Sequence, residues 1–203
     1  MSLDPIEASD RDRAALSRAL AAAFFDDPVS AWAIPPLALR ERALRRFFSA
    51  LLAAKLPGGF VYTNDDRAGS ALWAAPGGWK TTAVDGLRIA TTFSDPRLWP
   101  RGPLVARGLL AVERLHPRVP KHFYLAALGV VPQAQGKGLG SRLMRPVLDL
   151  CDAEGLPAYL ESSKEVNVPF YERHGFQVTR ELALPRGPTA WAMWREPLEH
   201  GAA

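Results

Sequence analysis

The sequence predicts a layered α/β domain in which helices cover a central sheet. The chain has 203 residues, a length that suits one domain, and we expect that domain to span residues 1–203. Apolar residues make up 48% of the chain, enough to bury a sizeable core. In the second half an apolar strand, a helix and another strand follow one another, which indicates a crossover between two strands of one sheet.

The first half of the chain is expected to hold a strand, two helices and a hairpin. The acids Asp10 and Asp12 favour the first turn of an alanine-rich helix. Apolar residues are interspersed with the arginines of residues 40–46, which predicts a second helix with a solvated basic face. This helix is expected to end at Pro57 and Gly58. A polar turn separates the two hairpin strands. The expected elements are a strand at 4–9, helices at 10–25 and 37–56 with a loop between them, and strands at 60–63 and 70–75.

The second half is irregular at first and then becomes clear. Residues 80–120 predict two helices joined by an irregular segment at 94–100. An apolar strand, a glycine-rich turn and a helix with Cys151 on its inner side come next. The expected elements are helices at 83–93 and 103–115, a strand at 122–131, a turn at 133–140, a helix at 141–154, a strand at 157–161, a short helix at 167–174, and two strands between 176 and about 194.

Composition excludes several classes of protein. The net charge of +4 comes from scattered basic residues without a recognised nucleic-acid motif, so we expect no nucleic-acid partner. A lone cysteine, Cys151, excludes an internal disulfide, and the four histidines lack ligand spacing, so we expect no metal. A basic-then-apolar leader and an apolar run of about 20 residues are both missing, which predicts a cytoplasmic protein with no membrane partner. The sequence leaves open whether the protein is a monomer or a homodimer.

The most informative stretch is the loop Gln135-Gly136-Lys137-Gly138-Leu139-Gly140, between a predicted strand and a predicted helix. Glycines let a backbone approach a ligand closely, and amides at a helix N-terminus can bind phosphate. A Walker A loop requires glycine where Val131 stands, and serine or threonine where Gly138 stands. A dinucleotide-binding fingerprint requires glycine where Ser141 stands. Both nucleotide motifs are therefore excluded, and a plain turn before a helix is the structural alternative.

The loop fits the pattern Gln/Arg-x-x-Gly-x-Gly/Ala and resembles the pyrophosphate loop of the GNAT acetyltransferase superfamily. Within that superfamily, residues 122–176 are most similar to puromycin N-acetyltransferase and its relatives, above all at 160–163 and 167–176. The resemblance implies the GNAT fold, a central mixed twisted sheet with two splayed parallel strands, flanked by helices. It also divides the domain into acceptor-side elements at about 1–120 and an acetyl-CoA-binding core at about 121–176.

The resemblance further implies that acetyl-CoA is the co-substrate and lies between the two splayed strands. Backbone groups of the first strand would bind the pantetheine arm, and the amide of Val130 would polarise the thioester carbonyl. Amides of the glycine loop would hold the pyrophosphate. Lys137 and Arg142 are candidates for the outer phosphates by charge alone, and ordinary exposed cations are the alternative. The implied cofactor-binding residues are Leu128, Val130, Val131, Gln135, Gly136, Lys137, Gly138, Leu139, Gly140, Ser141, Arg142 and Asn167.

Two residues are candidates for the acid–base chemistry. Tyr171 lies four residues after Asn167, on one face of a short helix that Asn167 is suited to cap. A tyrosine with a pKa of about 10 stays protonated at neutral pH, and the family counterpart of Tyr171 is the general acid for the departing thiolate; a core aromatic is the alternative. Glu161, at the end of the second strand, is a candidate base for the acceptor amine, or else a carboxylate that caps a turn or orients substrate. His116 and His122 are expected to pack or to lie on the surface.

Acceptor specificity is expected to come from the first half of the chain. An aromatic and acidic pocket there would suit a cationic amine, although each tryptophan is also a candidate core residue. The expected function is transfer of acetyl from acetyl-CoA to a primary amine of a small molecule, by direct attack in a ternary complex. The alternatives are acetylation of a protein or peptide amine, and a non-catalytic acyl-CoA-binding sensor. The candidate acceptor-binding residues are Phe25, Asp26, Asp27, Trp32 and Trp73.

Overall fold

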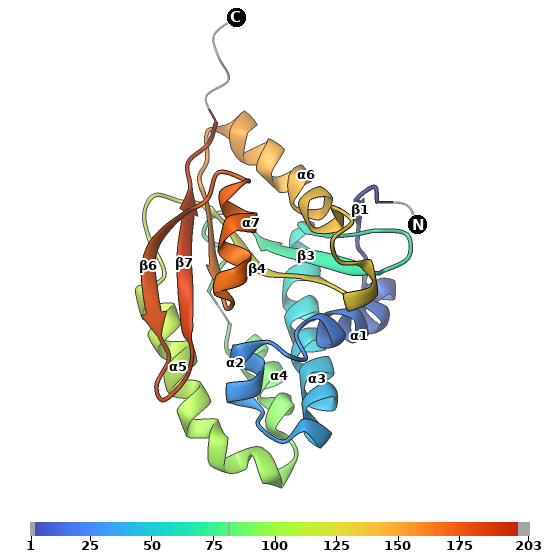
Figure 1. Cartoon of the computed structure of the whole chain (residues 1–203), viewed down its shortest axis with the longest axis vertical. Helices are drawn as coiled ribbons and strands as arrows, with labels where there is room; N and C mark the ends of the chain where they lie inside the picture. The colour runs from blue at the N-terminus through green and yellow to red at the C-terminus, as the bar shows by residue number, and fades with distance from the viewer. Residues whose placement is uncertain (1–2, 81, 199–203) are drawn as a thin grey trace, which may run out of the picture.

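The computed structural model describes residues 3–80 and 82–198, and Figure 1 shows its sheet and helices. Seven strands in these ranges form one sheet in the order β1-β2-β3-β4-β5-β7-β6. The pair β4 and β5 runs parallel, and the other neighbours are antiparallel. The sheet is therefore mixed, as expected. The strands are β1 (Ile6–Glu7), β2 (Val61–Thr63), β3 (Gly69–Ala74), β4 (Phe123–Val130), β5 (Ala158–Ser162), β6 (Gln177–Ala183) and β7 (Thr189–Arg195).

Helices flank this sheet, which confirms the α/β class. Short 3-10 turns connect several of them, at 10–12, 56–58, 91–93, 96–101, 132–134 and 165–167. Within the described ranges, none of the helices combines the length and the apolar character needed to cross a membrane. The α-helices are α1 (Arg13–Ala23), α2 (Pro28–Ala33), α3 (Leu37–Lys55), α4 (Ala83–Ala90), α5 (Gly102–Leu115), α6 (Leu139–Glu154) and α7 (Val168–Glu172).

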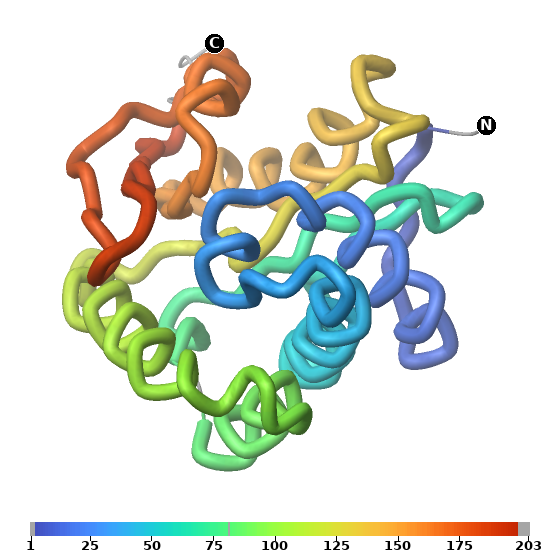
Figure 2. Tube along the Cα trace, turned by 60° about the horizontal axis from the view of Figure 1, so that its bottom comes forward, coloured from blue at the N-terminus to red at the C-terminus, as the bar shows by residue number. Residues whose placement is uncertain are grey.

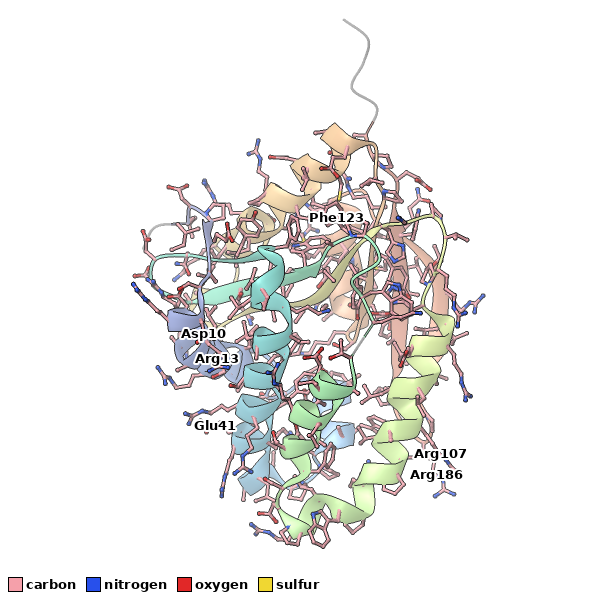
Figure 3. The ribbon with its side chains drawn as sticks, turned by 180° about the vertical axis from the view of Figure 1, so that it is seen from behind. Asp10, Arg13, Glu41, Arg107, Phe123 and Arg186 are labelled. Carbon is pink, nitrogen blue, oxygen red and sulfur yellow. The ribbon has the colours of Figure 1, made fainter. Side chains whose placement is uncertain are left out.

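The two faces of the sheet carry different helices. In Figure 1, α6 lies on one side of β3 and β4, whereas α1 and α3 lie on the other. On the α6 side, Leu143 and Val147 are fully buried against strand residues such as Phe123, which Figure 3 labels. On the other side, Leu20 of α1 and Leu52 of α3 are fully buried in a second cluster. Figures 1 and 2 both place α5 beside the β6–β7 hairpin, at the far end of the sheet.

Two local predictions were wrong in the first half of the chain. The loop expected after residue 25 contains α2, because Asp27 accepts hydrogen bonds from the amides of Val29 (2.9 Å) and Ser30 (3.2 Å) and so caps that helix. The basic face of α3 is not fully solvated either. Arg40 is 7% exposed and donates to the backbone oxygens of Ile34 (3.0 Å), Pro35 (3.2 Å) and Phe25 (3.3 Å). Its guanidinium therefore connects the segments before and after α2.

Two more differences lie in the second half. The segment expected to be irregular at 94–100 forms a 3-10 helix at Pro96–Arg101, where Asp95 caps the first turn by accepting from the amide of Arg97 at 3.0 Å. Helix α6 begins at Leu139, two residues before the predicted start. The glycine loop is correspondingly shorter, and its last residues belong to the first turn of the helix.

A bulge in β4 opens the sheet. On β3, Leu72 pairs with Ala127 and the next residue, Trp73, pairs with Leu125, so Ala126 is left over on β4. Pairing between β4 and β5 ends at Leu125, although β4 continues to Val130. The two parallel strands therefore diverge from the bulge onwards. This divergence creates the site described next.

Candidate active site

A cavity of about 310 Å³ occupies the space between the diverging strands. It is lined by the second half of β4, the end of β5 and the segment after β5. Tyr171 of α7 and the segment from the end of α1 to Asp27 complete the wall. Glu161 and Tyr171 both lie in its wall. The structure thus brings the two candidate acid–base residues to one cavity, from two elements that the sequence separates.

The backbone of β4 presents unpaired groups to this cavity. The Val131 amide donates to the Ala68 carbonyl at 2.8 Å, so Val131 faces β3. Backbone groups alternate in direction along an antiparallel ladder, so Val130 and Leu128 face the opposite side, where β5 has diverged. In agreement, the Val130 carbonyl accepts a hydrogen bond from the Gln135 side chain at 2.9 Å. Leu128 and Val130 therefore offer the amides expected of them, whereas the Val131 amide is already used within the sheet.

The glycine loop forms a second hollow next to the first. Gly136 and Gly138 have φ values of 72° and 80°, in the left-handed region that glycine adopts without strain. The first helical hydrogen bond of α6 runs from the Arg142 amide to the Gly138 carbonyl at 3.2 Å. The preceding amides, those of Leu139, Gly140 and Ser141, have no acceptor within the helix. They border a hollow of about 390 Å³, which suits an anion such as pyrophosphate.

The cations around this hollow differ from the prediction. Lys137 is exposed and donates to the Gln133 carbonyl at 3.0 Å. Arg142 is exposed and forms an ion pair with Asp4 at 3.3 Å. Neither side chain lines the hollow, whereas Arg173, which follows α7, does. Sequence reasoning missed Arg173, because only the packing of α7 against the loop brings its guanidinium close.

Asn167 lies at both cavities, in the N-cap position of α7. Its backbone is already helical, with φ of −89° and ψ of −13°, and its side chain makes no capping hydrogen bond. The predicted capping role was therefore wrong. A 3-10 turn at Glu165–Asn167 leads directly into the helix and replaces the cap. The side-chain amide is exposed and available to a ligand.

Tyr171 lies where the two cavities meet. The residue is 8% exposed, and its ring contacts those of Phe170 and Phe176, with centroids 5.1 Å and 6.1 Å away. Burial, together with the negative charge of Asp27, raises the pKa of Tyr171 above the ordinary tyrosine value. The phenol therefore keeps its proton at neutral pH, as a general acid must.

Glu161 borders the cavity from β5. Its side chain is 11% exposed, and its Oε1 lies 3.6 Å from Nδ1 of His116, the residue after α5. Tyr159 lies two residues before it on β5, and Tyr124 pairs with Tyr159 from the neighbouring strand β4. Burial, reinforced by the Glu161 carboxyl, raises the pKa of both tyrosines well above the ordinary value, so both are neutral. Sequence reasoning did not foresee these aromatic neighbours, although the alternation of Tyr159 and Glu161 along β5 places them on one face.

Of the predicted acceptor-binding residues, one lines the cavity. Asp27 does so, but its Oδ1 caps α2 and its Oδ2 accepts from the Ser163 hydroxyl. Asp26 is exposed, and Phe25 faces the Arg40 guanidinium, whose Cζ lies 5.5 Å from its ring centroid.

The two tryptophans lie outside the cavity. Trp32 donates its indole N–H to the Pro185 carbonyl at 3.2 Å and packs between α5 and the β6–β7 turn. Trp73 is 1% exposed in the core beneath α6. Both therefore serve as core residues, the alternative that the sequence left open. Side-chain direction along α2 and β3 decides this, and the residue types do not reveal it.

Two further features concern the lone thiol and the residues that could ligate a metal. Cys151 is fully buried on the inner side of α6, and burial raises its pKa to about 12, which makes the thiol a poor nucleophile. In the described ranges, no cluster of three or more His, Cys, Asp or Glu residues is arranged to hold a metal ion.

This geometry accords with what sequence comparison finds. The profile of the acetyltransferase (GNAT) family matches residues 41–176. The chain belongs to the GNAT family. It is therefore an acyltransferase, and members of this family use acetyl-CoA as co-substrate. An uncharacterized N-acetyltransferase of Schizosaccharomyces pombe is 31% identical over 195 residues, which cover 92% of this chain and 78% of that protein.

More distant relatives share parts of the sequence or the fold. The N-alpha-acetyltransferase RimI of Mycobacterium tuberculosis is 32% identical over 94 residues, 44% of this chain and 58% of that protein. A Corynebacterium glutamicum protein described as a histone acetyltransferase and related acetyltransferase superposes with a TM-score of 0.67 at 22% identity, over 98% of both chains. The polyamine N-acetyltransferase of Drosophila melanogaster gives a TM-score of 0.62 at 17% identity, over 95% of this chain and 100% of that one.

Proposed function

We propose that this GNAT enzyme transfers acetyl from acetyl-CoA to a primary amine of a small molecule, by direct attack in a ternary complex. The observation that carries the proposal is the placement of Glu161 and Tyr171 in one cavity, next to the unpaired edge of β4. Acetyl-CoA supplies the activated acetyl group. Residues 1–203 would act as one domain, with acceptor-side elements at about 1–120 and a co-substrate core at about 121–176, and we place the reaction in the cytoplasm.

The co-substrate fits the residues present. The backbone edge at Leu128 and Val130 lacks a strand partner, so it can bind an extended pantetheine arm in place of β5. The amides of Leu139, Gly140 and Ser141 would hold the pyrophosphate at the start of α6. A Cβ on Gly140 would lie 3.4 Å from the Phe170 ring, so a larger residue would crowd this hollow.

The chain's own groups would divide the proton transfers. The amide of Val130 would donate to the thioester carbonyl oxygen and stabilise the negative charge that develops there. Glu161 would take a proton from the acceptor amine, directly or through one water molecule. Tyr171 would donate its phenolic proton to the leaving sulfur. The buried phenol remains protonated over the whole neutral pH range, which supports this role.

A small cationic amine is supported by the shape and charge of the cavity. Its volume of about 310 Å³ is at the lower end of ligand pockets, and the end of the pantetheine arm would share it with the acceptor. The carboxylates of Asp27 and Glu161 both lie in its wall, together with the cation Lys164. The solved structures share the fold alone with this chain, so the acceptor class is argued from the cavity. The resemblance of residues 160–163 and 167–176 to puromycin N-acetyltransferase also favours a small amine.

The test is amine-dependent release of CoA from acetyl-CoA, measured with a thiol reagent. Purified protein is assayed with a panel of diamines, arylalkylamines, aminonucleosides and peptides with free N-termini. We expect turnover with a small primary amine and weak turnover with peptides. Turnover with peptides alone would instead indicate a protein N-acetyltransferase. Thermal stabilisation by acetyl-CoA without turnover on any acceptor would indicate a binding module.

A further inference from the structure

A cluster of buried rings lies behind Glu161, on the face of the sheet opposite α6. His116 follows α5, and His122 precedes β4, yet their Nε2 atoms lie 3.0 Å apart. His116 is 5% exposed and His122 is 2% exposed. The indole of Trp79, from the segment after β3, stacks on the His116 ring with centroids 4.0 Å apart and an interplanar angle of 18°. The segment after β3 and the connection between α5 and β4 thus bring an indole and two imidazoles together beside the candidate base.

The hydrogen bonds fix the tautomer of each ring. His122 Nδ1 lies 2.9 Å from the Pro120 carbonyl, which can only accept, so this nitrogen carries a hydrogen. Burial lowers the pKa of His122, so its ring is neutral and its Nε2 carries a lone pair. The 3.0 Å contact then requires His116 to donate from its own Nε2. The remaining nitrogen of His116, Nδ1, is the atom that faces Glu161.

This arrangement places two acceptors opposite each other when neither is protonated. Glu161 Oε1 is buried and has no hydrogen-bond partner among the described residues, and His116 Nδ1 lies 3.6 Å from it. One proton between these atoms would satisfy both groups. The stacked indole of Trp79 would stabilise the resulting imidazolium through its electron-rich face. Nδ1 of His116 can therefore accept a proton from Glu161.

The other groups around His116 do not compete for that proton. Tyr159 from β5 and Tyr124 from β4 meet the His116 ring edge-on, with centroids 4.7 Å away in both cases. Both are neutral, because burial and the Glu161 carboxyl raise their pKa. Lys80 is exposed, and its ammonium lies 5.8 Å from the Trp79 ring on the segment after β3. Glu161 and His122 are thus the groups that face the two ring nitrogens of His116.

We propose that His116 receives the proton that Glu161 takes from the acceptor amine. The proposal rests on the proposed function of Glu161 as base. As the amine nitrogen bonds to the acetyl carbon, its N–H bond breaks and the proton moves to the Glu161 carboxylate. The carboxyl O–H bond then breaks and His116 Nδ1–H forms, which leaves a carboxylate paired with an imidazolium. No charge is gained or lost in this second step. His116 acts through Glu161 and is a positioning residue, and His122 holds the tautomer that makes this possible.

The test compares His116→Gln with the wild type and with Arg114→Gln, which changes an exposed cation in the last turn of α5, two residues before His116. We expect kcat to fall about tenfold, less than the 10²–10⁴ of a direct general acid or base, because Glu161 itself remains. The KM for acetyl-CoA should be unchanged. The acidic limb of the kcat profile between about pH 5.5 and 9 should also shift. Arg114→Gln should behave as the wild type. A second variant, His116→Ala, opens space beside Trp79, and added imidazole should restore its turnover in a saturable way.

A spectroscopic measurement observes the His116 ring directly, without a substitution at that residue. In wild-type protein labelled with ¹⁵N, the His116 ring signals should report proton uptake at Nδ1, with Nε2 protonated throughout. In Glu161→Gln this titration should shift. Proton uptake by His116 that is unaffected by Glu161→Gln would overturn the inference. So would a His116→Gln enzyme with wild-type kcat and pH profile while Glu161→Gln is inactive. A fully active Glu161→Gln enzyme would instead refute the proposed base itself.

Discussion

Replacing Tyr171 by phenylalanine removes one oxygen atom from the point where the two cavities meet. The ring contacts with Phe170 and Phe176 remain, because only the hydroxyl oxygen is removed. The free energy of unfolding should therefore change by no more than about 1 kcal/mol. A general acid contributes about 10²–10⁴ in rate, which corresponds to about 2.7–5.5 kcal/mol of activation free energy. We thus expect a large loss of kcat in a protein of unchanged stability.

The assay is amine-dependent CoA release at saturating acetyl-CoA, together with a thermal melt of the same preparation. Tyr62→Phe is the matched control, because it removes the same atom from a half-buried tyrosine on β2, outside both cavities. The control should keep wild-type kcat. Unchanged turnover in Tyr171→Phe would refute the acid role and leave Tyr171 as a packing aromatic. If Tyr171→Phe lost stability as well as kcat, the hydroxyl would have a structural role, and the loss of kcat would no longer indicate a general acid.

Three further predictions follow from single contacts. Gly138→Ala places a residue with a Cβ at φ of 80°, which costs about 1–2 kcal/mol. The KM for acetyl-CoA should therefore rise about tenfold. The control Gly77→Ala, with φ of 83° in another loop, should leave this KM unchanged. Asp152→Ala should lower the free energy of unfolding in urea by about 3–5 kcal/mol, because it leaves Arg195, 4% exposed and bonded to Asp152 at 2.7 and 2.8 Å, without its buried partner. Burial lowers the pKa of His122 below its usual 6.5, so below that pH the unfolded chain binds a proton that the native chain does not, and stability falls on acidification. Melting temperatures measured from about pH 7.5 to 5 should fall less steeply in His122→Gln than in the wild type, and an equal slope would contradict the assignment.

The elements with strong local signals were predicted well. The expected helix at 37–56 and the strand at 122–131 match α3 and β4 to within one residue at each end. Helix α2 was missed, because six residues between two proline-containing segments give little periodicity. Its start depends on Asp27, which was interpreted as an acceptor-binding acid. The same carboxylate can cap a helix or bind an amine, and residue type alone does not distinguish these uses.

The sequence by itself determined the local order of elements at the proposed co-substrate site. The order of strand, glycine loop and helix at residues 122–154 is local, because the amides that would bind pyrophosphate belong to consecutive residues of one loop and helix start. Only left-handed glycines at 136 and 138 are needed to aim them. Such a site can be recognised from spacing, since the backbone itself provides the donors.

Only the tertiary structure decided the acceptor side and the surroundings of the base. Whether Trp32 and Trp73 face the cavity or the core depends on how α2 and β3 pack against other elements. Glu161 meets His116 because α5 ends beside β5, and the cavity exists because a bulge in β4 ends its pairing with β5. These contacts join residues far apart in the chain, and side-chain direction across them is set by packing, which the linear pattern does not encode.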